Sequence, residues 1–99
     1  MNINISEKPD NETLTKIFHA LSDPTRLEVL RLLVSRSSDE CNCTVLGENL
    51  DMSQPTMSYH MKTLREAGLI NTRKASREKI VSLNQETFDK YLPHFLDLL

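Results

Sequence analysis

A turn between two helix-forming segments constrains the fold of this chain more than any other feature of its sequence. Residues 51–53 read Asp-Met-Ser, a turn and capping composition, and they separate a short apolar-bearing segment, 44–50, from a longer one that runs to Gly68. Apolar side chains of the longer segment fall on one side of a helix, at Met57, Met61 and Leu64. Ser53 can cap this helix, Pro55 is tolerated in its first turn, and Gly68 can end it. The order predicts a helix-turn-helix.

Two further helices are predicted before this motif. The first spans residues 11–21, where apolar residues recur at helical spacing, namely Leu14, Ile17, Phe18 and Leu21. The second begins at Pro24, because Asp23 can accept hydrogen bonds from the free amides of a first turn and proline lacks an amide proton. Its apolar positions are expected to be Leu27, Leu30, Leu33 and Val34. A polar stretch at 35–39 predicts a loop after it.

Residues 69–83 change to β-forming patterning. The stretches 69–73 and 79–83 are rich in β-forming side chains and flank a polar, basic centre at 74–78. This pattern predicts a β-hairpin, or wing. The centre contains no glycine, so the sequence leaves the ends of the two strands open.

The C-terminal residues 85–99 return to helical spacing. Pro93 interrupts the pattern and must kink or restart the helix. The predicted fold class is therefore mainly α with a small β-hairpin, a single winged helix-turn-helix domain over residues 1–99. Such a domain of 99 residues, 38% of them hydrophobic, has a small core, and its terminal apolar helix suggests a homodimer partner.

The charge is unevenly distributed along the chain. The formal net charge is -2, yet residues 53–83 contain six basic side chains and two acidic ones. A positively charged segment on an otherwise anionic protein is expected where one face meets phosphate. No apolar run approaches the roughly 18 residues of a membrane span, and the polar, acidic start lacks a signal-peptide pattern. A cytoplasmic protein without a membrane partner is expected.

Two separated motifs resemble the ArsR/SmtB family of bacterial repressors. They are Phe-His-Ala-Leu-Ser-Asp-Pro-Thr-Arg-Leu at residues 18–27 and Ser-Gln-Pro-Thr-Met-Ser-Tyr-His-Met-Lys-Thr-Leu-Arg-Glu-Ala-Gly-Leu at residues 53–69. The resemblance covers nearly the whole chain. It implies a dimer of winged-helix domains, joined mainly through the first and last helices at about 11–21 and 85–99, that binds double-stranded operator DNA until an inducer releases it. It also implies that the helix at about 53–67 is the recognition helix.

The residue types at the start of that helix suit the major groove of DNA. Short polar groups near the N-terminus of a recognition helix can reach base edges, and Gln54, Thr56, Ser58 and Tyr59 supply them. Basic residues further along the helix and on the wing are expected to pair with phosphates. The candidate DNA-binding residues are Ser53, Gln54, Pro55, Thr56, Ser58, Tyr59, Lys62, Arg65, Arg73, Lys74, Arg77 and Lys79. His60 is interpreted as a helix-surface or partly packed histidine, and a direct DNA contact is ranked below that interpretation.

The two cysteines occupy the place of a metal-sensing element in the resembled family. Cys41-Asn42-Cys43 stands before the first helix of the helix-turn-helix, and thiolates suit As(III), Sb(III), Cd(II), Pb(II), Zn(II) or Cu(I). The arsenic-sensing pattern has a third cysteine where this chain has Leu46, so a second subunit or a non-sulfur ligand must complete the shell. A redox-sensitive pair and two inert, partly buried thiols remain open.

Three further interpretations complete the prediction. His94 and Asp97 imitate half of a second family metal site, but Val81 and Leu83 stand where its other half belongs, so that site is judged absent. No nucleophile, base and orienting group form a recognisable signature, so the chain is predicted not to be an enzyme and to require no cofactor. The alternative to a DNA-binding regulator is a winged-helix module for metal or protein binding, without sequence-specific DNA binding.

Overall fold

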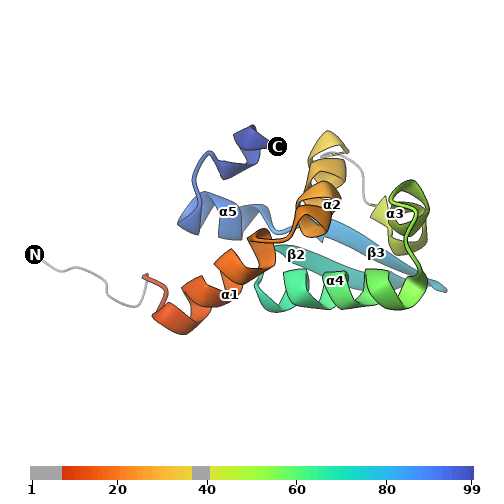
Figure 1. The fold of residues 1–99 in the computed structure, drawn as a ribbon, viewed down its shortest axis with the longest axis horizontal. Coiled ribbons are helices and arrows are strands. Elements are labelled where there is room, and N and C mark those ends of the chain that lie inside the picture. The colour runs from red at the N-terminus through yellow and green to blue at the C-terminus, as the bar shows by residue number, and fades with distance from the viewer. Residues whose placement is uncertain (1–7, 37–40) are drawn as a thin grey trace, which may run out of the picture.

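The computed structural model describes residues 8–36 and 41–99 (Figure 1). In chain order the elements are α1 (Asn11–Leu21), α2 (Pro24–Ser35), β1 (Cys41–Asn42), α3 (Cys43–Asn49), α4 (Gln54–Glu66), β2 (Ile70–Ala75), β3 (Glu78–Leu83), α5 (Gln85–Tyr91) and the 3-10 helix η2 (Phe95–Leu98). The predicted class, helices with a small β-hairpin wing, is confirmed. Most of the loop expected at 35–39 lies outside the described residues. In the described part, no helix has the length and apolar character needed to cross a membrane.

The capping residues set the helix starts as the sequence predicted. The Asp23 carboxylate accepts hydrogen bonds from the amides of Thr25, at 2.7 Å, and Arg26, at 3.1 Å. The Ser53 hydroxyl accepts from the amide of Thr56 at 3.4 Å. Gly68 follows α4 with a φ of 77°, the left-handed conformation that ends the helix. These contacts join residues two or three positions apart, which is why the sequence alone could reveal them.

The sheet contains a strand that the sequence analysis did not predict. The strand order is β1-β3-β2, and β1 pairs with β3 through Cys41 opposite Val81. A segment of two residues is too short to show the alternation of apolar and polar side chains that marks a strand in a sequence. Strand β1 therefore forms only because β3 offers a free edge for backbone pairing.

The wing strands are longer than expected, because they take in part of the basic centre at 74–78. Ala75 pairs with Glu78, which leaves a two-residue loop, and its first residue, Ser76, has a φ of 60°. The left-handed position that usually takes glycine is therefore held by serine.

The core lies between the helices and one face of the sheet. Its buried hydrophobic residues are Ile17, Ala20, Val29, Leu30, Leu33, Cys41, Leu46, Met57, Met61, Leu64, Ala67, Leu69, Ile70, Val81 and Phe88. Two expectations were wrong in detail. Phe18 of α1 is 56% exposed, and Ala20 is buried in its place. In α2, Val29 is buried and Leu27 is only half-buried, because the side chain that enters the core from the first turn of this helix is that of Arg26.

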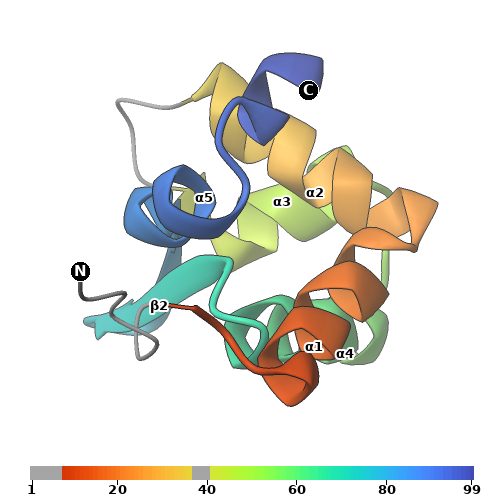
Figure 2. The ribbon, with the colours of Figure 1, turned by 90° about the vertical axis from the view of Figure 1, so that its left-hand side faces the viewer.

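The C-terminal region is two short helices separated by a break. α5 ends at Tyr91, and η2 begins at Phe95, after His94 with a φ of 69°. The predicted interruption at Pro93 is thereby confirmed, and residues 85–99 do not form one continuous helix. Figures 1 and 2 show α1 and α5 together at one end of the molecule, whereas the tip of the wing lies at the other end.

Candidate nucleic-acid interface

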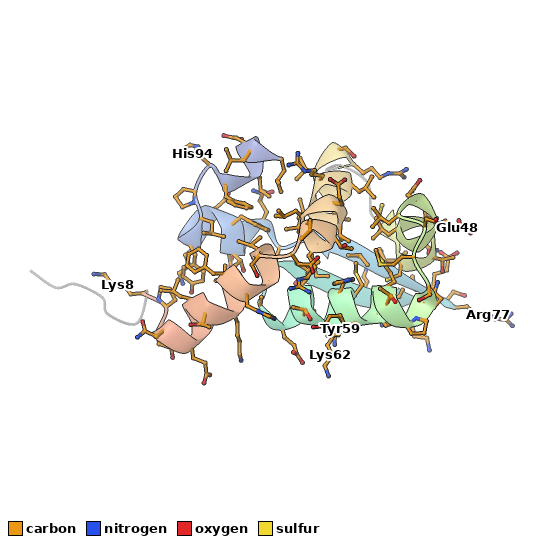
Figure 3. The ribbon with its side chains drawn as sticks, in the orientation of Figure 1. Lys8, Glu48, Tyr59, Lys62, Arg77 and His94 are labelled. Atoms are coloured by element: carbon orange, nitrogen blue, oxygen red, sulfur yellow. The ribbon has the colours of Figure 1, made fainter. Side chains whose placement is uncertain are left out.

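The outer face of α4 is polar and exposed along its whole length. Every candidate residue at its start and along it is exposed, namely Ser53, Gln54, Pro55, Thr56, Ser58, Tyr59, Lys62 and Arg65. Tyr59 is an aromatic side chain with 59% of its surface exposed. In Figure 3 Lys62 extends from α4 away from the rest of the domain, and Tyr59 lies beside it on the same helix. The arrangement leaves this helix face free to enter a groove of a nucleic acid.

The inner face of α4 explains why that outer face is presented. Met57, Met61 and Leu64 are at most 1% exposed and anchor the helix in the core. The turn before α4 is held by a backbone hydrogen bond of 2.9 Å from the amide of Met52 to the carbonyl of Gly47. A Cβ atom added at Gly47 would lie 3.5 Å from the Met52 carbonyl oxygen, so the turn packs closely against α3. The buried methionines and the tight turn fix α3 and α4 together.

The polar groups at the start of α4 differ in their availability. The Ser53 hydroxyl donates to the Thr56 hydroxyl oxygen over 3.0 Å while it caps the helix. Capping of α4 therefore already engages the hydroxyl groups of Ser53 and Thr56, two of the candidate DNA-binding residues. Gln54, Ser58 and Tyr59 stand on the same exposed surface, and we regard their side chains as the principal candidates for contacts with base edges.

The wing brings two lysines face to face. Lys74 pairs directly with Lys79 across the hairpin, and both are exposed. Like charges directly opposite one another in an antiparallel pair destabilise it. Since strand residues alternate between faces, these lysines share the face of Val81, and Arg73 lies on the opposite face. The four basic wing residues therefore do not form one surface, a division that the sequence analysis did not foresee.

A groove of about 440 Å³ connects the start of α4 with the tip of the wing. Gln54 and Ser58 line it from α4, and Arg77 and Lys79 line it from the wing. The remaining lining residues are Asn42, Cys43, Thr44, Val45 and Glu78. Figure 3 shows Arg77 at the end of the hairpin, beyond the start of α4. The fold thus brings the polar side chains of Gln54 and Ser58 and the basic side chains of Arg77 and Lys79, which are distant in sequence, into one groove.

The histidines are placed differently from one another. His60 is only 8% exposed and does not belong to the outer face of α4, so of the two placements expected for it, on the helix surface or partly packed, the packed one is found. His19 is exposed on α1. His94 lies 3.6 Å from Asp97, and both side chains are at least 80% exposed.

The cysteine pair is split between the core and the groove. Cys41 is 2% exposed and lies in β1, whereas Cys43 is the first residue of α3 and lines the groove. Burial raises the pKa of the Cys43 thiol, and the positive charge of Lys79 acts in the opposite direction. Within residues 8–36 and 41–99, no three His, Cys, Asp or Glu side chains gather to hold a metal ion. Two thiols fit the chemistry of a soft ion, but the described residues do not supply a complete shell.

Comparisons with known proteins agree with this architecture. The family model described as "Helix-turn-helix domain" matches residues 21–73. The chain is 48% identical to the uncharacterized HTH-type transcriptional regulator YceK of Bacillus subtilis, covering 94% of this chain and 92% of that protein. It is 42% identical to an arsenical resistance operon repressor of Staphylococcus xylosus, covering 87% and 79% of the two chains. A crystal structure of an ArsR family transcriptional regulator, RHA00566, superposes with a TM-score of 0.72 at 33% identity, over 83% of this chain and 81% of the other.

Proposed function

Since the chain belongs to the ArsR family of winged helix-turn-helix transcriptional regulators, we propose that it represses transcription as a homodimer that binds an inverted-repeat operator and leaves it when an inducer acts. The observation that carries the DNA role is the exposed face of α4, which shares one groove with Arg77 and Lys79 of the wing. The relatives are named as transcriptional regulators, so we propose no enzymatic reaction. For the same reason the alternative function, a winged-helix module for metal or protein binding without sequence-specific DNA binding, is not favoured. We place its action in the cytoplasm, where bacterial operons are transcribed.

The proposed contacts divide into two kinds. Gln54, Ser58 and Tyr59 read base edges in the major groove. The N-cap residue Ser53 and the first-turn residues Pro55 and Thr56 place the start of the helix against the DNA. The basic residues hold phosphates, which fixes the register of the protein on the duplex and supplies the salt-dependent part of the affinity. They are Lys62, Arg65, Lys74, Arg77 and Lys79, whereas Arg73 lies on the opposite face of the wing from the two lysines and is not placed among them.

A salt series tests the DNA role directly. A duplex pool with a randomised central region is selected on the purified protein, and the affinity for the enriched duplex is measured by fluorescence anisotropy. We expect log affinity to fall linearly with log salt concentration, with a slope of several units, because several phosphates are neutralised. A protein that enriches no sequence and binds no duplex even at low salt is not a DNA-binding repressor, and the protein-interaction module would then be the better explanation.

The proposed homodimer rests on apolar side chains left exposed in the two segments that the family resemblance assigns to the interface, 11–21 and 85–99. Phe18 is 56% exposed and Leu98 is 72% exposed. Half-buried Tyr91, Leu92 and Phe95 pack against the core nearby. Isolated exposed apolar residues are ordinary, but aromatic and aliphatic side chains at the two predicted dimer segments are typical of a surface that is covered in the assembly.

We expect Phe18→Asp to weaken the dimer by at least about tenfold, because a desolvated aromatic contact would be replaced by a buried charge. Sedimentation velocity over a concentration series measures the change. Tyr59→Asp is the matched control, since Tyr59 is an equally exposed aromatic residue on the DNA face and its replacement should leave the oligomeric state unchanged. Equal dimer fractions for wild type and Phe18→Asp would place the interface elsewhere.

For the inducer we propose a thiophilic metalloid that acts at Cys41 and Cys43. Relatives named as arsenical resistance operon repressors support this choice. The placement of the pair supports it as well, because Cys41 lies in the strand paired with the wing and Cys43 begins the helix before α4. A displacement of either residue would therefore reach the wing or the recognition helix. The thiols would provide two ligands, and the second protomer or a non-sulfur group would provide the rest.

The double variant Cys41→Ser/Cys43→Ser is expected to bind the selected duplex but to remain bound when arsenite is added, whereas the wild type is released. Anisotropy of the labelled duplex follows the release. The single Cys43→Ser variant controls for stability, because Cys43 is only partly buried and a serine at Cys41 places a hydroxyl in the core. If arsenite and other thiophilic ions leave wild-type binding unchanged but a thiol oxidant abolishes it, the redox alternative is correct. If neither acts, the pair is inert.

A further inference from the structure

We propose that Arg26 and His60 are positioning residues that hold the recognition helix in its DNA-binding orientation, and that a proton added to His60 releases it. The proposal rests on α4 being the DNA-reading helix, as argued above. Neither side chain belongs to the DNA face. Arg26 is 4% exposed and His60 is 8% exposed, and they are the buried polar or charged residues of the described part of the chain.

One guanidinium group connects three helices. Arg26 Nε donates to the carbonyl oxygen of Ala20 over 2.8 Å, and Nη2 donates to that of His19 over 3.1 Å, both at the end of α1. Arg26 Nη1 lies 3.1 Å from Nδ1 of His60 in the middle of α4. Arg26 itself stands in the first turn of α2, where the Asp23 carboxylate accepts its amide proton. The contact therefore fixes α4 relative to α1, the helix to which we assign dimer contacts.

The chemistry of the pair determines the protonation state of His60. A guanidinium group has donors but no acceptor, so the Nδ1 atom of His60 must accept. His60 is therefore a neutral imidazole with its proton on Nε2 in this arrangement. A second proton, on Nδ1, would remove the acceptor and place a cation against a buried guanidinium. The contact between α2 and α4 would then become repulsive.

One of the groups around His60 acts against that repulsion. The carboxylate of Asp23 is close enough to attract a protonated His60, and it also accepts the amide hydrogens of Thr25 and Arg26. On α4 itself, the ring of Tyr59 stands edge-on to His60 with 5.3 Å between centroids. The other titratable or charged side chains on the elements packed against α4 are all exposed apart from the half-buried Cys43, namely Glu12, Lys16, His19, Glu28, Arg31, Glu48, Arg73 and Lys74. The helix α4 itself adds the exposed Lys62, Arg65 and Glu66.

The test compares DNA affinity at about pH 7.5 and pH 5.5, a range over which histidines ordinarily change charge. His60→Asn is the informative variant, because its Oδ1 can accept from Arg26 but cannot titrate. His19→Asn is the matched control, because the His19 side chain is exposed and only its carbonyl contacts Arg26. We expect wild type and His19→Asn to lose about tenfold in affinity for the selected duplex at the lower pH, the worth of one hydrogen bond to a charged group.

His60→Asn is expected to match the wild type at the higher pH and to keep its affinity at the lower pH. A general effect of acid has the opposite sign, since protonation of exposed histidines adds positive charge and strengthens DNA binding. A purely structural His60 would leave the pH profiles of the three proteins parallel. That outcome overturns the proposal, and it leaves the DNA role intact because binding itself is still observed.

A measurement without DNA separates the two proposals. In ¹⁵N-labelled protein we expect His60 to show the Nε2-protonated tautomer at about pH 7.5, and amide hydrogen exchange in α4 to accelerate more at about pH 5.5 than in His60→Asn, after correction for intrinsic rates. An Nδ1-protonated tautomer, or equal acceleration in both proteins, overturns the positioning role. If no duplex is bound at either pH, the DNA role fails, and this measurement still decides whether the pair holds α4.

Discussion

Replacement of both Lys74 and Lys79 by alanine is expected to weaken binding to every DNA sequence by about thirtyfold near physiological salt and to reduce the salt slope by about two units. The physical reason is the loss of two phosphate contacts, each of which releases counterions. The same change should leave the fold as stable as before, or slightly more stable, because it removes a pair of like charges held opposite each other in the hairpin. Affinity and stability therefore move in different directions.

The control variants assign the roles. Gln54→Ala is expected to lose about tenfold in affinity for the selected duplex and little for unrelated DNA, since a base contact discriminates between sequences. Arg31→Ala removes an exposed cation from α2, outside the DNA face, and should change neither affinity nor salt slope by more than a small factor. Equal losses on specific and unrelated DNA for Gln54→Ala and the double lysine variant would show that the division into base-reading and phosphate-holding residues is wrong.

The substitution Phe88→Ala is expected to cost about 4 kcal/mol of folding free energy. Phe88 is 1% exposed, and its ring stacks on Phe95 with 6.1 Å between centroids, so it joins both C-terminal helices to the core. A small domain has only about 5–15 kcal/mol of total stability, and the loss would leave a large unfolded fraction under mild denaturation. Urea unfolding followed by circular dichroism at fixed protein concentration measures it, because the dimer contributes to stability.

Tyr59→Ala is the comparison for Phe88→Ala. It also removes an aromatic ring from a helix, but that ring is 59% exposed, so its loss should change stability by no more than about 0.5 kcal/mol. A similar loss of stability in both variants would mean that aromatic content, and not the burial of Phe88, supports the C-terminal helices.

Much of the fold was predictable because its signals are local. The bounds of α1 and the starts of α2 and α4 follow from apolar spacing and from caps that act over two or three residues. The exposed face of α4 was predictable for the same reason, since the burial of Met57 and Met61 turns the intervening positions outward. The assignment of individual DNA contacts on that face stays a prediction.

The parts that could not be predicted depend on residues distant in sequence. Strand β1 exists because Cys41 pairs with Val81. Arg26 was noted as part of a motif, but its partner His60 stands 34 positions further along, and no local pattern connects them. Periodicity also placed Phe18 in the core, whereas the packing of α1 leaves it exposed. Each of these outcomes follows from how helices and strands pack against one another, which a hydrophobic pattern does not specify.

The sequence by itself determined that this chain contains a helix, a tight turn and a capped second helix with a polar outer face, followed by a basic hairpin, because caps, turns and apolar spacing act over a few bonds. The tertiary structure alone decided which basic residues share a face, which thiol is buried, and that a buried arginine fastens α4 to α1. Those properties arise from side chains brought together across the core, where close packing and the need to satisfy a buried guanidinium select one arrangement.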